Sequence, residues 1–150
     1  MTNKDLYVNL FASNNADIEL GSRSVRIAQE TNYPWEGKVT MIIDPEKAGR
    51  FTVRVRIPGW ARNEAIPGNL YSFAGQSEEK HKLIVNGAKI DAPIENGYAV
   101  ITRKWQAGDR IELDIPMPVR TVVADEQVKE DEGKYAVQRG PLMFCAEWPD

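Results

Sequence analysis

Cysteine and histidine are almost absent from this sequence of 150 residues, in which Cys145 and His81 are single occurrences. One cysteine permits no internal disulfide and leaves the redox compartment undetermined. So few thiols and imidazoles cannot build a Cys/His metal cluster, and we expect neither a metal site nor a cofactor. A Ser-His-Asp relay would depend on His81, whose place after a charged segment favours a solvated side chain.

Long apolar runs and basic patches are missing as well. No run approaches the roughly 20 residues that span a bilayer, so we expect no membrane partner. The net charge is −3 and the lysines and arginines are not clustered along the chain, which argues against a nucleic-acid partner. Residues 1–5 lead straight into a predicted strand, so we expect no signal peptide at this point. A longer parent protein with a signal upstream would be periplasmic or secreted.

No stretch of the sequence has the periodicity of an α-helix. Several stretches instead alternate strictly between apolar and polar residues. In FTVRVRIPGWA (Phe51–Ala61), the residues up to Ile57 alternate between apolar and polar, as in a strand with one buried face. Pro58-Gly59 ends this strand, and Trp60 is placed to close the end of a core. About ten such strands with turns between them predict an all-β, jelly-roll-like antiparallel β-sandwich in a single domain, residues 1–150.

Two further patterns organise the second half of the chain. Asn86-Gly87 and Asn96-Gly97 are the sequence signature of tight β-hairpin turns. The stretch Arg62–Lys80 is rich in glycine, proline and charge and is predicted to be a long loop between strands. Trp105, directly after a strand, is expected in the core.

A glycosidase needs two carboxyl groups that lie roughly 5–10 Å apart. Asp44 and Asp109 stand at turns and Asp114 lies on the wet face of a strand, so their expected roles are structural. Glu30 and Glu36 flank an aromatic loop and are the acids with a possible ligand role. No catalytic residue is predicted.

The aromatic loop itself, Asn32–Gly37, contains Tyr33, Pro34 and Trp35 in a row. Pro34 holds the backbone extended, so the three apolar residues cannot all reach one core, and at least one ring should face outward. Tyr33, Trp35, Glu30 and Glu36 are therefore the candidate residues for contact with a ligand or a neighbouring domain. Near the end of the chain, Cys145 is expected as a buried inert thiol and Trp148 as a contact to the next part of a longer parent chain.

Several blocks taken together resemble glycoside hydrolase family 127 and its close relative family 146, the β-L-arabinofuranosidases. They are LYVNLF (Leu6–Phe11), QETNYPWEGKV (Gln29–Val39), FTVRVRIPGWA (Phe51–Ala61), LIVNG (Leu83–Gly87), GYAVITRKWQAGDRIELDIPMPVR (Gly97–Arg120) and YAVQRGPLMFCAE (Tyr135–Glu147). They occur in this order and cover nearly the whole chain.

The resemblance implies a larger enzyme in which a helical (α/α)₆ barrel precedes the β-sandwich region. It also implies that the catalytic cysteine, the acid/base glutamate and the zinc-binding cysteines lie in that barrel. Cys145 matches a sandwich block and not the nucleophile, so no catalytic residue carries over. The substrate of the family, an L-arabinofuranoside of plant polysaccharides or glycoprotein glycans, is that of the parent enzyme.

Three functions come into consideration. The first is an accessory sandwich that packs on the catalytic barrel of the same parent chain and stabilises it. The second is a carbohydrate-binding module for plant polysaccharide or glycoprotein glycans. The third, an autonomous hydrolase, lacks a plausible carboxylate pair. A binding module should present a flat row of exposed aromatic rings, whereas a docking domain should present an exposed apolar patch of a few hundred Å².

Overall fold

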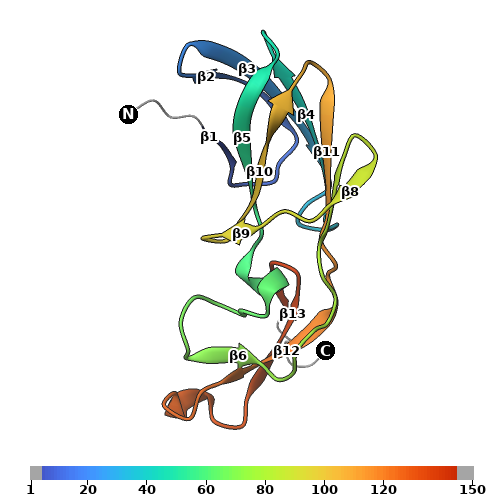
Figure 1. Cartoon of the computed structure of the whole chain (residues 1–150). Helices are drawn as coiled ribbons and strands as arrows, with labels where there is room; N and C mark the ends of the chain where they lie inside the picture. Colours follow the sequence, from blue (N-terminus) through green and yellow to red (C-terminus); the bar gives the residue numbers. More distant parts are fainter. Residues whose placement is uncertain (1–4, 145–150) are drawn as a thin grey trace. The chain divides into compact units, whose positions relative to one another are not determined.

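A computed structural model describes residues 5–144 of the chain (Figure 1). Within that range the chain forms fourteen β-strands and two short 3₁₀ helices. The predicted all-β class with antiparallel sheets is confirmed, with more strands than the ten that the sequence indicated. Cys145 and Trp148 lie outside the described residues.

The chain divides into two compact units, where a single domain was predicted from the sequence. Unit 1 is formed by residues 1–57 and 81–115, and unit 2 by residues 58–80 and 116–150. Each unit is therefore built from two separate stretches of chain.

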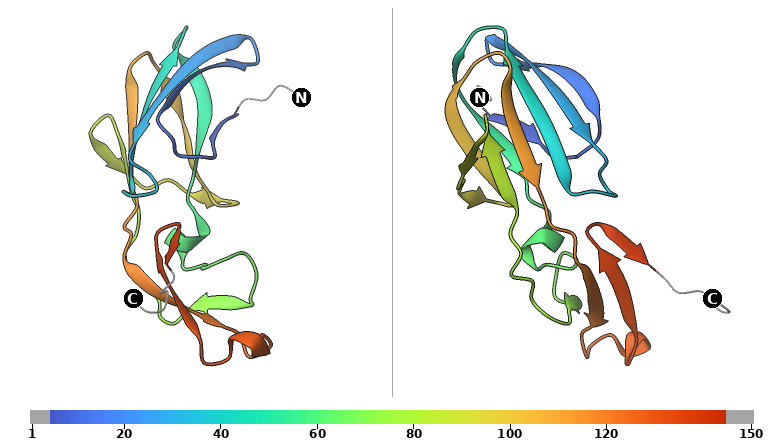
Figure 2. Two further views of the ribbon diagram at one scale, coloured as in Figure 1. Left: turned by 180° about the vertical axis from the view of Figure 1, so that it is seen from behind. Right: turned by 90° about the vertical axis from the view of Figure 1, so that its right-hand side faces the viewer.

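Unit 1 is a sandwich of two sheets. Sheet A has the order β1 (Asp5–Val8), β5 (Gly49–Arg56), β10 (Tyr98–Trp105), β9 (Ile94–Glu95). Sheet B has the order β2 (Asn14–Leu20), β3 (Arg23–Thr31), β4 (Lys38–Pro45), β11 (Asp109–Asp114), β7 (Lys82–Val85), β8 (Ala88–Ile90). All neighbours are antiparallel except β1 and β5, which run parallel. Figure 2 shows β5 and β10 in one layer and β3, β4 and β11 in the other.

The core of unit 1 follows the period of two that the sequence shows. Phe51, Val53 and Val55 of β5 are buried, and the residues between them are partly exposed. Met41 and Ile43 of β4 face them from sheet B with no exposed surface. Alternation on both layers thus places one face of each sheet in a shared apolar interior.

Two tryptophans that were both expected in or against the core differ. Trp105 is completely buried, and its indole N–H donates to the carbonyl oxygen of Phe51 at 3.1 Å. Trp60 is half-buried and belongs to unit 2, so it is not part of the core of unit 1. After Pro58 the chain turns into the 3₁₀ helix η1 (Gly59–Arg62) of unit 2, so Trp60 no longer follows the alternation of β5.

Both predicted hairpins are present. Asn86 and Gly87 have φ values of 51° and 79° between β7 and β8, and Asn96 has a φ of 50° between β9 and β10. Asparagine and glycine adopt these left-handed conformations more readily than other residues, which is why the pair marks the turn so clearly.

Unit 2 is organised around one sheet. Sheet C has the order β14 (Leu142–Phe144), β13 (Tyr135–Arg139), β12 (Val119–Ala124), β6 (Tyr71–Phe73), all antiparallel. The predicted loop Arg62–Lys80 therefore contains a strand, β6, which adds to the edge of sheet C. A second 3₁₀ helix, η2 (Lys129–Asp131), lies between β12 and β13.

Candidate functional site

The aromatic loop forms a compact turn at the end of β3. The backbone N–H groups of Trp35 and Glu36 both donate to the carbonyl of Asn32, at 2.9 and 3.2 Å. The Thr31 hydroxyl donates to the carbonyl of Lys38 at 2.6 Å and accepts from the N–H of Tyr33 at 3.0 Å. Backbone hydrogen bonds and the Thr31 hydroxyl thus fix the turn and orient the rings that it carries.

The two rings of this turn point to different surroundings. Tyr33 is half-buried and meets the ring of Phe11 edge-on, with 5.4 Å between centroids. Trp35 is 66% exposed, and Leu10, beside Phe11 in sequence, is 81% exposed. The expectation that at least one ring of the loop faces outward is met by Trp35.

The two candidate acids are both on the surface of unit 1. Glu30 is exposed on β3, opposite Thr40 of β4 in the register. Glu36 is exposed in the aromatic turn. The carboxyl pair of a glycosidase works on either side of a bound sugar, and an exposed position encloses neither acid in such a site.

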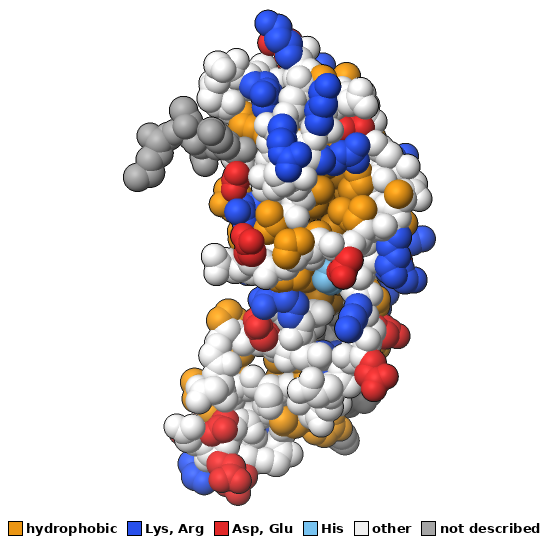
Figure 3. Space-filling view, viewed as in Figure 1, with side chains coloured by type: hydrophobic (Ala, Val, Ile, Leu, Met, Phe, Trp, Pro, Cys, Tyr) orange, Lys and Arg blue, Asp and Glu red, His pale blue; other side chains and the backbone are white. Residues whose placement is uncertain are grey.

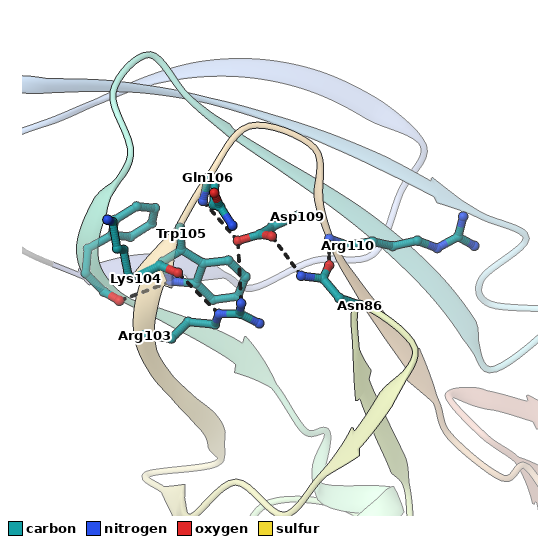
Figure 4. A network of polar contacts seen from close by, with 8 residues as sticks. Asn86, Arg103, Lys104, Trp105, Gln106, Asp109 and Arg110 are labelled. Carbon is teal, nitrogen blue, oxygen red and sulfur yellow. Dashed lines mark hydrogen bonds and ion pairs between the residues drawn. The ribbon is translucent and has the colours of Figure 1, made fainter.

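Within residues 5–144, Asp109 is the acid that the fold buries, and its contacts are structural (Figure 4). One carboxylate oxygen accepts from the side-chain amide of Asn86 at 2.7 Å, and the other accepts from the N–H of Gln106 at 2.9 Å. The Asn86 side chain also accepts from the N–H of Arg110 at 2.8 Å. Asp109 therefore links the β10–β11 turn to the β7–β8 hairpin. Asp44 likewise accepts from the N–H of Gly108 at 2.5 Å, so both aspartates have the turn role that the sequence predicted.

Aromatic residues also occur on the outer face of sheet A. Tyr7 and Tyr98 meet edge-on, with 5.4 Å between ring centroids. The guanidinium of Arg54 lies over Tyr7 at 5.7 Å, and that of Arg56 lies over Tyr98 at 5.2 Å. Arg54 also pairs with Asp5 at 2.6 Å and with Glu95 at 3.0 Å, and hydrogen bonds to these carboxylates raise its pKa.

One face of sheet C in unit 2 is open and mainly apolar, with Thr121 and Arg139 as its polar members on β12 and β13. Because side chains alternate along a strand, β12, β13 and β14 place a set of apolar residues on the same face. In this set Val119 is 68%, Tyr135 73% and Phe144 48% exposed. The less exposed members of the set are Val123, Val137 and Leu142. We call these six residues the open face of sheet C; none of them was a candidate from the sequence.

The opposite face of sheet C has a cavity of about 380 Å³ lined mainly by apolar side chains, including Ile66, Val122 and Met143. At its rim the Tyr71 hydroxyl donates to Asp131 at 2.9 Å, which raises the pKa of Tyr71. The Asp131 carboxylate also lies 3.6 Å from the ammonium group of Lys134.

Residues 5–144 contain neither a candidate metal cluster nor a membrane-spanning helix. No group of three or more His, Cys, Asp or Glu side chains in that range could hold a metal ion. None of its helices has the length and apolar character needed to cross a bilayer. His81 is half-buried, and its burial lowers the pKa of the imidazole.

Comparison with known proteins gives the chain a family. Residues 5–117 match the middle domain of the GH127 β-L-arabinofuranosidases, and residues 119–150 match the C-terminal domain of glycoside hydrolase family 127. The chain belongs to glycoside hydrolase family 127. The boundary between the two matches falls close to Ile115, where the second stretch of unit 1 ends.

Three relatives show how much of a family-127 enzyme this chain represents. The non-reducing end β-L-arabinofuranosidase of Bifidobacterium longum subsp. longum is 33% identical over 145 residues, which are 93% of this chain and 19% of that enzyme. A solved GH127 β-arabinofuranosidase is 40% identical with a TM-score of 0.92 over 100% of this chain and 24% of its own. A solved GH127 β-L-arabinofuranosidase of Geobacillus stearothermophilus T6 is 40% identical with a TM-score of 0.79 over 95% of this chain and 20% of its own. The chain thus spans a quarter or less of these relatives.

Proposed function

We propose that this family-127 chain is a non-catalytic accessory part of a β-L-arabinofuranosidase-like glycoside hydrolase, in which it packs on and stabilises the catalytic barrel of the same polypeptide. Its membership of the family and its small share of the relatives, 19–24% of their length, support this proposal. The exposed positions of Glu30 and Glu36 support a role outside catalysis.

The observation that carries the proposal is the open face of sheet C. Val119 and Tyr135 on this face are 68% and 73% exposed. Among the described residues, Val122 is the one buried apolar side chain of unit 2, whereas unit 1 contains all the others. A sheet that buries so little apolar surface of its own is marginal by itself, and an apolar face of this kind is typical of a surface that another structure covers.

Leu10 and Trp35 are a second apolar surface, on unit 1. They are 81% and 66% exposed, on segments that the ring contact between Phe11 and Tyr33 brings together. We propose that the barrel covers this surface as well.

The carbohydrate-binding alternative has one favourable observation, the exposed ring of Trp35. Against it, Tyr33 in the same turn packs edge-on against Phe11 and cannot extend a flat platform. On sheet A the rings of Tyr7 and Tyr98 meet edge-on and so share no plane, and Arg54 and Arg56 each lie over one of them. A flat row of open aromatic rings, which stacking on a polysaccharide requires, is therefore not formed by these residues.

The test compares this 150-residue chain with a full-length family-127 enzyme that contains it. Val119→Asp should change the stability of the isolated chain by no more than about 0.5 kcal/mol, because the side chain is already in water. In the full-length enzyme the same change should bury a charge and lower the melting temperature and the yield of active protein. Ile94→Asp is the matched control at an exposed apolar position of β9. Equal tolerance of both changes by the full-length enzyme would show that this face is not covered.

Trp35→Ala separates the two candidate functions. On the accessory proposal it leaves the isolated chain nearly as stable as before and lowers the stability or activity of the full-length enzyme. If arabinan oligosaccharides quench the fluorescence of the wild-type chain and not that of Trp35→Ala, the carbohydrate-binding function replaces the accessory one. If Trp35→Ala unfolds the isolated chain, the ring is part of the core and neither function can be assigned to it.

A further inference from the structure

The cavity on the face of sheet C opposite its open face lies entirely within unit 2. Val122 and Ala136 contribute to it from β12 and β13, and Tyr71 from β6. Ile66 borders it from the loop before β6, and Asp131 of η2 lies at one end. Its volume of about 380 Å³ is in the range of small-molecule sites in proteins. We call it the sheet C cavity.

The exposure of the lining residues distinguishes a floor from a mouth. Val122 is 4% exposed and belongs to the floor, whereas Met143 and Tyr135 are 52% and 73% exposed and border the mouth. A small molecule can therefore enter past Met143 and Tyr135 while unit 2 stays folded.

The lining favours an aromatic ring over a sugar. Most of it is formed by apolar side chains, namely Ile66, Val122, Ala124, Ala136 and Met143. Sugar hydroxyl groups buried against these side chains would lose their water partners without replacement, which is costly. An aromatic ring has no such cost, and it can meet the rings of Tyr71 and Tyr135 edge-on and contact the thioether of Met143.

The rim of the cavity offers one fixed hydrogen-bond acceptor. Because the Tyr71 hydroxyl donates its proton to Asp131 at 2.9 Å, its oxygen remains able to accept a hydrogen bond from a ligand. The hydrogen bond to Asp131 raises the pKa of Tyr71, and the negative charge of Glu130 adds to this effect. Figure 3 shows acidic side chains, with a basic one beside them, at the end of unit 2 where η2 follows β12. A neutral hydroxyl group suits this rim better than a carboxylate does.

We propose that the sheet C cavity binds a small, neutral aromatic molecule that carries a hydroxyl group. The ring lies on the apolar floor, and the hydroxyl donates to the oxygen of Tyr71. An engineered apolar cavity of about 150 Å³ takes up benzene, so the sheet C cavity has room for two rings.

A free molecule fits this cavity better than a covering protein segment. A segment laid over the mouth would have to remove water from the charged groups of Asp131 and Lys134 at the rim, whereas a ring inside the cavity leaves them in water. The proposal is independent of the accessory role, because that role depends on the other face of sheet C.

The test is a titration of the 150-residue chain with 2-naphthol, followed through the NMR signal of the Met143 methyl group. Naphthalene lacks the hydroxyl, and 2-naphthoate carries a charge in its place. We expect saturable binding of 2-naphthol and weaker binding of both other probes. Tyr71→Phe should raise the Kd of 2-naphthol about fivefold, as expected for one lost hydrogen bond, and change that of naphthalene by no more than about twofold.

A filled cavity provides the second arm of the test. Ala124→Leu/Ala136→Leu should raise the Kd of 2-naphthol and of naphthalene at least tenfold, with a thermal midpoint equal to or above that of the wild type. Ala88→Leu, at an exposed position of β8 in unit 1, is the control and should change neither Kd. If the filled variant does not fold, the comparison of the two probes in Tyr71→Phe decides alone.

Four results would overturn the proposal. They are no binding of 2-naphthol by the wild type, tighter binding of 2-naphthoate, an equal effect of Tyr71→Phe on 2-naphthol and naphthalene, and unchanged binding by a folded, filled variant. A full-length family-127 enzyme containing this chain should bind 2-naphthol as well. Failure of that enzyme to bind would mean that its own side chains fill the cavity, and the free-ligand site would be wrong.

Discussion

At position 37 the residue type is restricted to glycine by the nearby backbone of Ile115. The carbonyl of Gly37 accepts from the N–H of Ile115 at 3.0 Å, and a Cβ atom at this position would lie 1.8 Å from the carbonyl oxygen of Ile115. The obstacle is backbone, which cannot rotate away as a side chain can. Only glycine therefore allows the aromatic turn to approach the end of β11 so closely.

Gly37→Ala is expected to lower the free energy of unfolding by about 2–4 kcal/mol, because backbone must move to admit the methyl group. Urea denaturation followed by tryptophan fluorescence measures the change. Gly75→Ala is the control, since a Cβ atom there would meet nothing within 4 Å. If both variants had the same denaturation midpoint, the close approach of the two backbones would be wrong.

The tryptophans show for which residues burial or exposure can be predicted from the sequence. Trp105 keeps the alternation of β10, so its burial follows from the pattern. Trp60 looked equivalent because it also follows a strand, but Pro58-Gly59 leads into a 3₁₀ helix and changes the direction of the side chain. The exposure of Trp35 could be argued from sequence because three apolar residues in one turn cannot share one core.

At the scale of elements, local turn chemistry was predictable and distant pairing was not. The Asn-Gly pairs fix their hairpins within a few residues, and both were predicted. Strand β6 was missed because its three residues pair with β12, about 50 positions along the chain, and little in their own pattern marks them as a strand.

The two hairpins offer a matched comparison of side-chain and backbone roles. Asn86 and Asn96 both have φ near 50°, but only Asn86 has described side-chain hydrogen bonds, to Asp109 and to the N–H of Arg110. Asn86→Gly keeps the turn but removes the amide that donates to the buried Asp109. It should therefore lower the free energy of unfolding by about 1–3 kcal/mol. Asn96→Gly should leave the free energy of unfolding nearly unchanged. Equal thermal midpoints for the two glycine variants would contradict this difference.

At the scale of the whole molecule, the candidate acids lead to a prediction about activity. Glu30 and Glu36 are exposed, and the family resemblance implies that the nucleophile and the acid/base lie in the barrel. The 150-residue chain should therefore release no arabinose from an aryl β-L-arabinofuranoside at any enzyme concentration. Release that disappears in Glu30→Ala or Glu36→Ala would mean that the acids of this chain are catalytic.

The two units differ in how much apolar surface they bury, and this difference should be visible in the isolated chain. Unit 1 has a two-layer core with Trp105, Met41 and Ile43 at its centre, whereas unit 2 has one sheet with an open apolar face. Regions with few buried apolar contacts open at low cost in free energy.

Native-state hydrogen exchange should therefore give strong protection to the amides of β4, β5, β10 and β11 and weak protection to those of β12, β13 and β14. In a full-length family-127 enzyme, we expect the protection of β12–β14 to rise toward that of unit 1, because the accessory proposal has the open face of sheet C covered there. Val119→Asp in the full-length enzyme should reverse that gain, and Ile94→Asp should not. Protection of β12–β14 that is already as strong as that of β5 in the isolated chain would mean that unit 2 is complete by itself, and the main support for the docking role would be lost.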